Sequence, residues 1–217
     1  MSTDPTVARA WKGLFRLTRM RTKRAFRELQ PWPGLSGMRF DGAYREKLTL
    51  HDGSIVMVRL LQPGDRSYLQ AGLLGLSERS RYLRFHSAKT EFSRDELRYL
   101  TQIDQINHVA LIAYRRDGVK REGIGVARFV SLTRDRQVAE AALVVSDEFQ
   151  GKGLGLLLLE RLIAAAAERG VRTLSCEVLA ENRAARALLE KKLGARVVSR
   201  EGSSLVLELE VTGCVNA

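Results

Sequence analysis

The sequence predicts a mixed α/β fold of the α+β class, in which helices flank one mostly antiparallel sheet. Signals for antiparallel strands come first, as a hairpin at residues 44–61 and a meander at 108–146. A helix–strand–helix–hairpin unit follows at 154–211. That order of elements is typical of a sheet covered by helices. With 217 residues, 45% of them hydrophobic, the chain is large enough to bury one substantial core.

Turn and cap signals define the first half of the main domain. Asp52-Gly53 separates two β-rich segments, as expected of a hairpin. Ser93 and Glu96 form a capping box that begins a helix. The elements predicted up to residue 146 are strands at 44–50 and 55–61, helical segments at 66–76, 78–85 and 93–102, and strands at 108–114, 123–131 and 138–146.

The second half contains longer periodic segments. A Leu- and Ala-rich helix at 154–169 ends at Gly170, because glycine readily adopts the left-handed conformation that closes a helix. A buried strand at 173–179 and a helix at 182–192 follow it. A hairpin, formed by 197–201 and 205–211, completes the predicted sheet.

The N-terminal segment differs in charge from the rest of the chain. The formal net charge is +11, and residues 1–39 carry nine Lys or Arg against two Asp or Glu. Residues 4–29 place apolar and basic side chains on opposite stripes, which predicts a basic amphipathic helix that begins at Asp4 and Pro5. The predicted division is this helix with a Pro/Gly linker (1–43), the main domain (44–212) and a tail (213–217).

Several roles for the basic helix stay open. Its apolar stripe can pack on the main domain or on a second copy in a homodimer. Its basic stripe can lie on an anionic membrane surface, whereas binding to nucleic acid through phosphates is less favoured. The segment has no role if translation starts at Met38.

The composition argues against several classes of protein. Two cysteines, Cys176 and Cys214, cannot make a disulfide framework, and three scattered histidines do not have the spacing of a zinc site. No segment approaches the roughly 18 apolar residues of a spanning helix, and no signal peptide is evident. We therefore expect a cytoplasmic, reduced protein without a bound metal, either free or peripheral at a membrane.

Three glycines at alternate positions form the most informative motif. Gly151, Gly153 and Gly155 come after the apolar strand 138–146 and directly before the helix at 154–169. Glycine lets the backbone approach a ligand closely, and a helix N-terminus offers unpaired N–H groups that suit a phosphate or diphosphate. Neither the dinucleotide fingerprint G-x-G-x-x-G nor the Walker A loop fits the spacing. A tight turn that binds no ligand is the alternative interpretation.

The motif Gln150-x-x-Gly153-x-Gly155 resembles the acetyl-CoA diphosphate loop of the GNAT superfamily of N-acetyltransferases. The segment that begins Glu181-Asn182-Arg183 is similar to the superfamily's motif B, whose Asn lies near the pantetheine arm. The resemblance covers 54–211 and implies a GNAT-like fold with acetyl-CoA as cosubstrate. The residues it implies for acetyl-CoA binding are Leu143, Val144, Val145, Gln150, Gly151, Lys152, Gly153, Leu154, Gly155 and Asn182. The alternative for Asn182 is a helix cap.

A narrower resemblance is to the acetyltransferase domain of Pat-type bacterial protein lysine acetyltransferases. It rests on the segments 80–85, Leu100-Thr101-x-x-Asp104, 108–113 and Ala139-Glu140. Pat-type enzymes have a catalytic Glu at the position of Glu140. The acceptor that this likeness implies is a primary amine, either a protein lysine or a small molecule.

Glu140 is the candidate general base. A lysine-like amine has a pKa of about 10.4, so only about 1 in 2,000 molecules is neutral at pH 7 and a base is needed to accept its proton. Glu140 lies in an otherwise apolar run, which raises a carboxylate pKa towards the useful range. The alternative is a glutamate that points to solvent. His86 and His108 are weaker candidates for the base, and Cys176 is expected to be a buried apolar residue.

The sequence departs from the superfamily pattern at two places. Leu189 stands where many members have a Tyr that acts as general acid. The interval from Asn182 to Gly194 is one residue longer than usual, which predicts a bulge or a shifted role for the Asn. These departures keep a second function open, a non-catalytic sensor or regulatory protein that binds acyl-CoA. A third possibility is a membrane- or nucleic-acid-binding protein for which this domain is only a scaffold.

Overall fold

The computed structural model describes residues 38–118, 120–132 and 137–211. Its strands are β1 (Arg45–Thr49), β2 (Ile55–Leu60), β3 (His108–Asp117), β4 (Lys120–Ser131), β5 (Val138–Val145), β6 (Thr173–Leu179), β7 (Arg196–Glu201) and β8 (Ser204–Glu210). Its helices are α2 (Arg66–Leu74), α3 (Glu78–Phe85), α4 (Arg94–Thr101), α5 (Leu154–Ala167) and α6 (Arg183–Arg186), the last followed by a π-helical turn at Ala187–Lys192. The expected helix at 4–29 and the tail at 213–217 lie outside the described residues.

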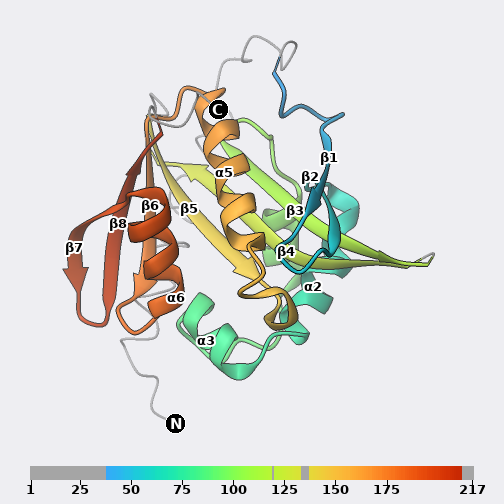
Figure 1. Cartoon of the computed structure of the whole chain (residues 1–217), viewed down its shortest axis with the longest axis horizontal. Helices are drawn as coiled ribbons and strands as arrows, with labels where there is room; N and C mark the ends of the chain where they lie inside the picture. The colour runs from blue at the N-terminus through green and yellow to red at the C-terminus, as the bar shows by residue number, and fades with distance from the viewer. Residues whose placement is uncertain (1–37, 119, 133–136, 212–217) are drawn as a thin grey trace.

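All eight strands form one sheet in the order β1-β2-β3-β4-β5-β6-β8-β7 (Figure 1). Every neighbouring pair is antiparallel except β5 and β6. The predicted class, a mostly antiparallel mixed sheet with flanking helices, is therefore confirmed. The β1–β2 turn at Asp52-Gly53 and the capping box of Ser93 and Glu96 are also present as predicted.

The parallel pair opens a gap in the sheet. β5 and β6 pair only over Val138–Glu140 and Thr173–Ser175, although both strands continue beyond these residues. Because the strands diverge, the second half of β5 has no ladder partner on its β6 side. An unpaired strand edge presents N–H and C=O groups to whatever enters the gap.

Helices cover the two faces of the sheet unequally. α5 and α6 lie on the near face in Figure 1, where the larger hydrophobic core includes Leu158, Leu162 and Ile163 of α5. α2 lies behind the sheet, over a smaller core that contains Leu69. Side chains alternate along β5, so Ala139 and Ala141 belong to the larger core while Glu140 points to the opposite face.

The region from Asn182 to Gly194 differs from the continuous helix that the sequence predicts. Only Arg183–Arg186 is α-helical, and Ala187–Lys192 forms a wider π turn. A π turn is the usual way for a helix to absorb one extra residue, and such turns are frequent at functional sites. The extra residue noted in the sequence therefore has a physical counterpart in this turn.

Candidate active site

A cleft of about 490 Å³ lies where β5 and β6 diverge. Its volume falls within the range of about 300–1,000 Å³ that is usual for ligand pockets. The end of β5, the glycine turn, the start of α5, α3 and α6 contribute to its wall. The cleft therefore gathers residues as far apart in the sequence as His51 and Lys192.

The glycine turn has the backbone conformation that its composition requires. Gly151 has φ +74° and Gly153 has φ +92°, a region that side chains disfavour. Gly153 is the N-cap of α5, so the first turn of that helix directs unpaired N–H groups and its positive dipole end towards the cleft. A Cβ on Gly155 would lie 3.3 Å from the side chain of Leu143. This geometry suits a diphosphate.

The structure brings nine of the eleven predicted site residues to the cleft wall. They are Glu140, Leu143, Val144, Val145, Gln150, Gly151, Gly153, Gly155 and Asn182. The side chains of Lys152 and Leu154 do not line it. Leu154 is fully buried in the core, and the Nζ of Lys152 lies 2.9 Å from the Asp52 carboxylate.

Gln150 belongs to a polar network that fixes the turn before α5. Its Nε2 donates to Ser80 Oγ, Val145 O and Asp147 Oδ1, each at 3.2 Å. Asp147 in turn accepts hydrogen bonds from the N–H of Ser77, at 2.7 Å, and from the hydroxyls of Ser77 and Ser80. The network ties the start of α3 to the glycine turn, a link between distant segments that the sequence did not predict.

Glu140 lies half-buried at the point where the two strands separate, opposite Ser175 of β6. Burial raises the pKa of its carboxyl, the Arg84 cation lowers it, and the Glu177 carboxylate raises it further. The net direction is upwards, as expected for a general base that works near neutral pH. Neighbouring Cys176 is buried, and burial followed by the Glu140 charge raises the pKa of its thiol to about 12. Cys176 is therefore not a nucleophile at neutral pH.

Asn182 caps α6, because its Oδ1 accepts a hydrogen bond from the N–H of Ala185 at 3.1 Å. The same residue lines the cleft, so the cap and a ligand contact are compatible roles. Leu189 also lines the cleft and is 5% exposed. Among the described residues that form the cleft, none is a tyrosine that could replace the missing acid.

The three histidines have different surroundings. His108 is buried, and burial followed by the charge of Arg128 lowers its pKa well below the usual value. His86 lines the cleft and lies 3.9 Å from the Glu177 carboxylate. His51 also lines the cleft, and its Nε2 would be 2.8 Å from a Cβ on Gly153. Neither His51 nor Arg84 had a sequence signal that marked it as part of the site.

No described helix is both long enough and apolar enough to span a membrane. Within the described part of the chain, no three His, Cys, Asp or Glu side chains gather as a metal site would require.

Comparisons with known proteins agree with the fold and the cleft. The family model described as "Acetyltransferase (GNAT) family" matches residues 79–195. Acetyltransferase Pat of Mycolicibacterium smegmatis is 31% identical over 73% of this chain, but the match spans only 46% of that relative's length. Acetyltransferase PA5475 of Pseudomonas aeruginosa is 33% identical over 64% of this chain and 75% of its own length.

The solved structure of the GNAT domain of S. lividans PAT is similar in fold and sequence. It superposes with a TM-score of 0.72 at 27% identity, over 79% of this chain and 99% of that domain. The family model covers more than half of the chain, and the diverging strands, the glycine turn and Glu140 all lie within that span. The chain therefore belongs to the GNAT family of acetyltransferases.

Proposed function

We propose that the chain transfers the acetyl group of acetyl-CoA to a primary amine, with Glu140 as the general base. The observation that supports this best is that Glu140 and the glycine turn line one cleft. The cleft extends from the strand gap to the glycine turn, which suits an elongated molecule with a diphosphate at one end and a thioester at the other. The relatives named as acetyltransferases support the same reaction class.

Each part of the cleft has a separate task in this proposal. The N–H groups at the start of α5 bind the diphosphate, and the open edge of β5 at Leu143–Val145 pairs with the pantetheine arm. Backbone N–H groups at that edge polarise the thioester carbonyl. Asn182 offers its side-chain amide from the far wall, because only its oxygen is engaged in the α6 cap.

Glu140 receives the proton that the amine loses. The amine nitrogen attacks the carbonyl carbon, the new C–N bond forms, and the C–S bond breaks. The proton of the amine passes to the Glu140 carboxylate, directly or through one water. The leaving thiolate takes a proton from solvent, which is feasible because a thiol has a pKa of about 8.5. No tyrosine is required at the position of Leu189.

Calorimetry with acetyl-CoA, followed by turnover of Glu140→Gln, tests the proposal. We expect saturable binding to the wild type, unchanged binding to Glu140→Gln, and a loss of about 10²- to 10⁴-fold in kcat/KM for that variant. Glu177→Gln is the matched control, because it removes a carboxylate from the same cleft without removing the base. Absence of acetyl-CoA binding refutes the proposal, whereas binding without any turnover supports the sensor alternative.

A further inference from the structure

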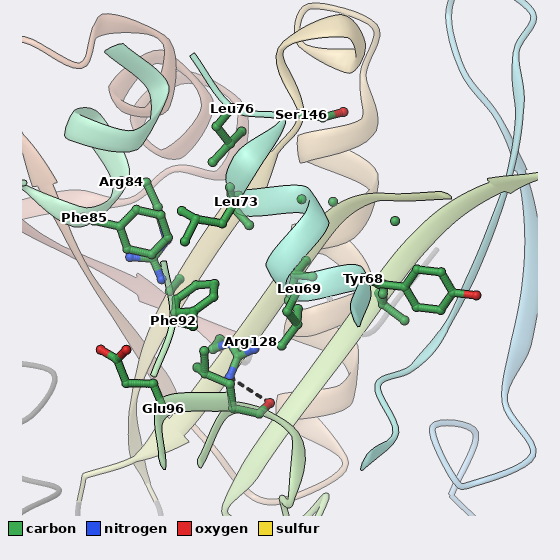
Figure 2. Close-up of a pocket in the computed structure, with 18 of the residues that line it drawn as sticks. Tyr68, Leu69, Leu73, Leu76, Arg84, Phe85, Phe92, Glu96, Arg128 and Ser146 are labelled. Atoms are coloured by element: carbon green, nitrogen blue, oxygen red, sulfur yellow. Dashed lines mark hydrogen bonds between the residues drawn. The ribbon is translucent and has the colours of Figure 1, made fainter. Parts of the chain in front are cut away.

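A second, smaller cavity of about 100 Å³ adjoins the cleft on the other face of β5 (Figure 2). It lies beneath α2, α3 and α4, over β4 and β5. Arg84, Phe85, Ala142 and Val144 line both cavities, so the two spaces share a wall. Glu140 lines the cleft rather than the small cavity, and its electrostatic interaction with Arg84 connects it to the shared wall.

The walls are mostly apolar but contain two arginines, of which Arg128 is buried and Arg84 is half-buried. Apolar side chains come from α2, from the segment around α3 and from the sheet, and include Leu69, Leu73, Phe85, Phe92, Ile112 and Val126. In the view of Figure 2, Phe92 is drawn between Arg84 and Arg128, and the charge of Arg84 acts on Arg128. Arg84 comes from α3 and Arg128 from β4. Guanidinium groups in an apolar cavity require an explanation, since burial without an anion strongly disfavours a charge.

Arg84 and Arg128 have no carboxylate partner within ion-pair distance among the described residues. The Nε of Arg84 is buried and makes no hydrogen bond there. Arg128 is 7% exposed, and its Nη1 donates to Leu100 O at 3.3 Å and to His108 Nε2 at 3.1 Å. Because a guanidinium only donates, His108 accepts through Nε2 and is neutral. It therefore does not balance the charge.

Neither Glu96, which lines the cavity, nor Glu140, which lines the adjoining cleft, forms an ion pair with these arginines. Glu96 lines the wall, but its oxygens accept from Lys89 Nζ at 2.9 and 3.0 Å and from the N–H of Ser93 at 2.7 Å. Glu140 interacts with Arg84 electrostatically without a hydrogen bond. Arg84 and Arg128 also repel each other: burial first, and then the Arg84 charge, lower the pKa of Arg128 to about 10. The cavity therefore has an excess of positive charge.

We propose that the acceptor is a small primary amine that also carries a carboxylate, such as an α-amino acid with an apolar side chain, and that Arg84 and Arg128 bind this carboxylate. The proposal rests on the acetyl transfer proposed above and names its acceptor class. The planar guanidinium fork matches a carboxylate, Glu140 faces the amine, and the apolar walls receive the side chain. A protein lysine would leave both arginines unpaired, because its stem carries no anion.

The size of the cavity agrees with such a ligand. A cavity of about 150 Å³ holds one benzene molecule, so about 100 Å³ accommodates only a few heavy atoms. The carboxylate and a short side chain fit within it, while the amine extends into the adjoining cleft. A folded protein substrate could reach the cleft but not this recess.

Acceptor specificity of the full chain tests the inference. We would measure CoA release with the apolar amino acids, and then compare alanine, whose side chain suits the small recess, with alaninamide, ethylamine and a blocked peptide that contains one lysine. We expect kcat/KM for the best amino acid to exceed that for its amide by at least about 100-fold, because a site built to bind a polar group rejects analogues that lack it. In Arg84→Gln this ratio should fall at least tenfold, while acetyl-CoA should still bind saturably. Arg79→Gln, an equal charge change at an exposed position of α3, should keep the wild-type ratio.

The outcomes separate this inference from the proposed function. If the amide, the simple amine or only the lysine peptide is acetylated efficiently, acetyl transfer stands and the carboxylate site is wrong. If acetyl-CoA does not bind, both are wrong. Should Arg84→Gln fail to fold, calorimetry on the wild type saturated with CoA provides the test: alanine must bind at least tenfold more tightly than alaninamide, and equal binding overturns the inference.

Discussion

Replacing Gly151 with alanine should weaken acetyl-CoA binding far more than an equally strained glycine replacement elsewhere. Gly151 has φ +74° and Gly53 has φ +80°, and a Cβ at either position would have no neighbour within 4 Å. Both replacements therefore cost about 1–2 kcal/mol of left-handed backbone strain, without a clash. Only Gly151 lines the cleft. A methyl group there would occupy space that the diphosphate needs, and we expect Kd to rise at least tenfold, or about 1.4 kcal/mol.

Gly153→Ala extends the comparison to a position where a new methyl group would contact a neighbouring side chain. Its φ is +92°, and the new Cβ would lie 2.8 Å from His51 Nε2. We expect a larger loss of stability than for Gly151→Ala, and part of that loss should be recovered when His51→Ala is added. A double-mutant cycle isolates this contact from the backbone strain.

Two measurements on each variant decide the reasoning. Denaturant unfolding gives the cost to the fold, and calorimetry with acetyl-CoA gives the cost to binding. The reasoning fails if Gly151→Ala binds acetyl-CoA as tightly as the wild type does. It also fails if Gly53→Ala and Gly151→Ala lose the same affinity, because the loss would then come from the strained fold rather than from the turn at the ligand.

The remaining predictions concern stability. Asp65→Asn should lower the free energy of unfolding by about 3–5 kcal/mol, since Arg59 bonds both carboxylate oxygens at 2.7 and 2.6 Å and would be left buried and unpaired. Asp147→Ala should cost about 1–3 kcal/mol, because it removes the acceptor that joins the start of α3 to the glycine turn. Asp95→Ala is the control for both: its side chain is 90% exposed and its ion pair with Arg98 should contribute less than about 1 kcal/mol. Urea unfolding of the three variants checks these values, and equal midpoints would contradict them.

Local signals account for the success of the fold prediction. The Asp52-Gly53 turn, the Ser93–Glu96 capping box and the Gly170 stop each act within a few residues, and each is present in the structure. The order of strands also follows from short connections between antiparallel neighbours. The π turn at Ala187–Lys192 was predictable only as an irregularity, because one extra residue does not specify how the backbone absorbs it.

The candidate site divides in the same way. Residues of one continuous segment, from Glu140 to Gly155, were predictable as a group because a strand, a turn and a helix follow directly upon one another. Arg84 and His51 were not predictable as site residues, since only the tertiary fold brings α3 and the β1–β2 turn to the cleft. The ion pair of Lys152 with Asp52 was not predictable either, because only the tertiary fold brings the β1–β2 turn beside the glycine turn.

The raised pKa of Glu140 should give stability and activity opposite dependences on pH. Burial raises its pKa in the folded protein above the ordinary value of 4.5, so the folded state retains the proton to a higher pH than the unfolded state does. Between these two values the free energy of unfolding should fall as pH rises, whereas kcat/KM should rise because the base becomes ionised. Glu140→Gln should abolish both dependences.

The neighbours of Glu140 predict the direction of each shift. Arg84→Gln removes a cation that lowers the Glu140 pKa, so the acid limb of the kcat/KM profile should move to higher pH. Glu177→Gln removes a carboxylate that raises it, and the limb should move to lower pH. Profiles of kcat/KM against pH for the two variants and the wild type test these signs. Identical acid limbs in all three would mean that Glu140 is not the group that titrates, and the general base would have to be sought among the other residues of the cleft.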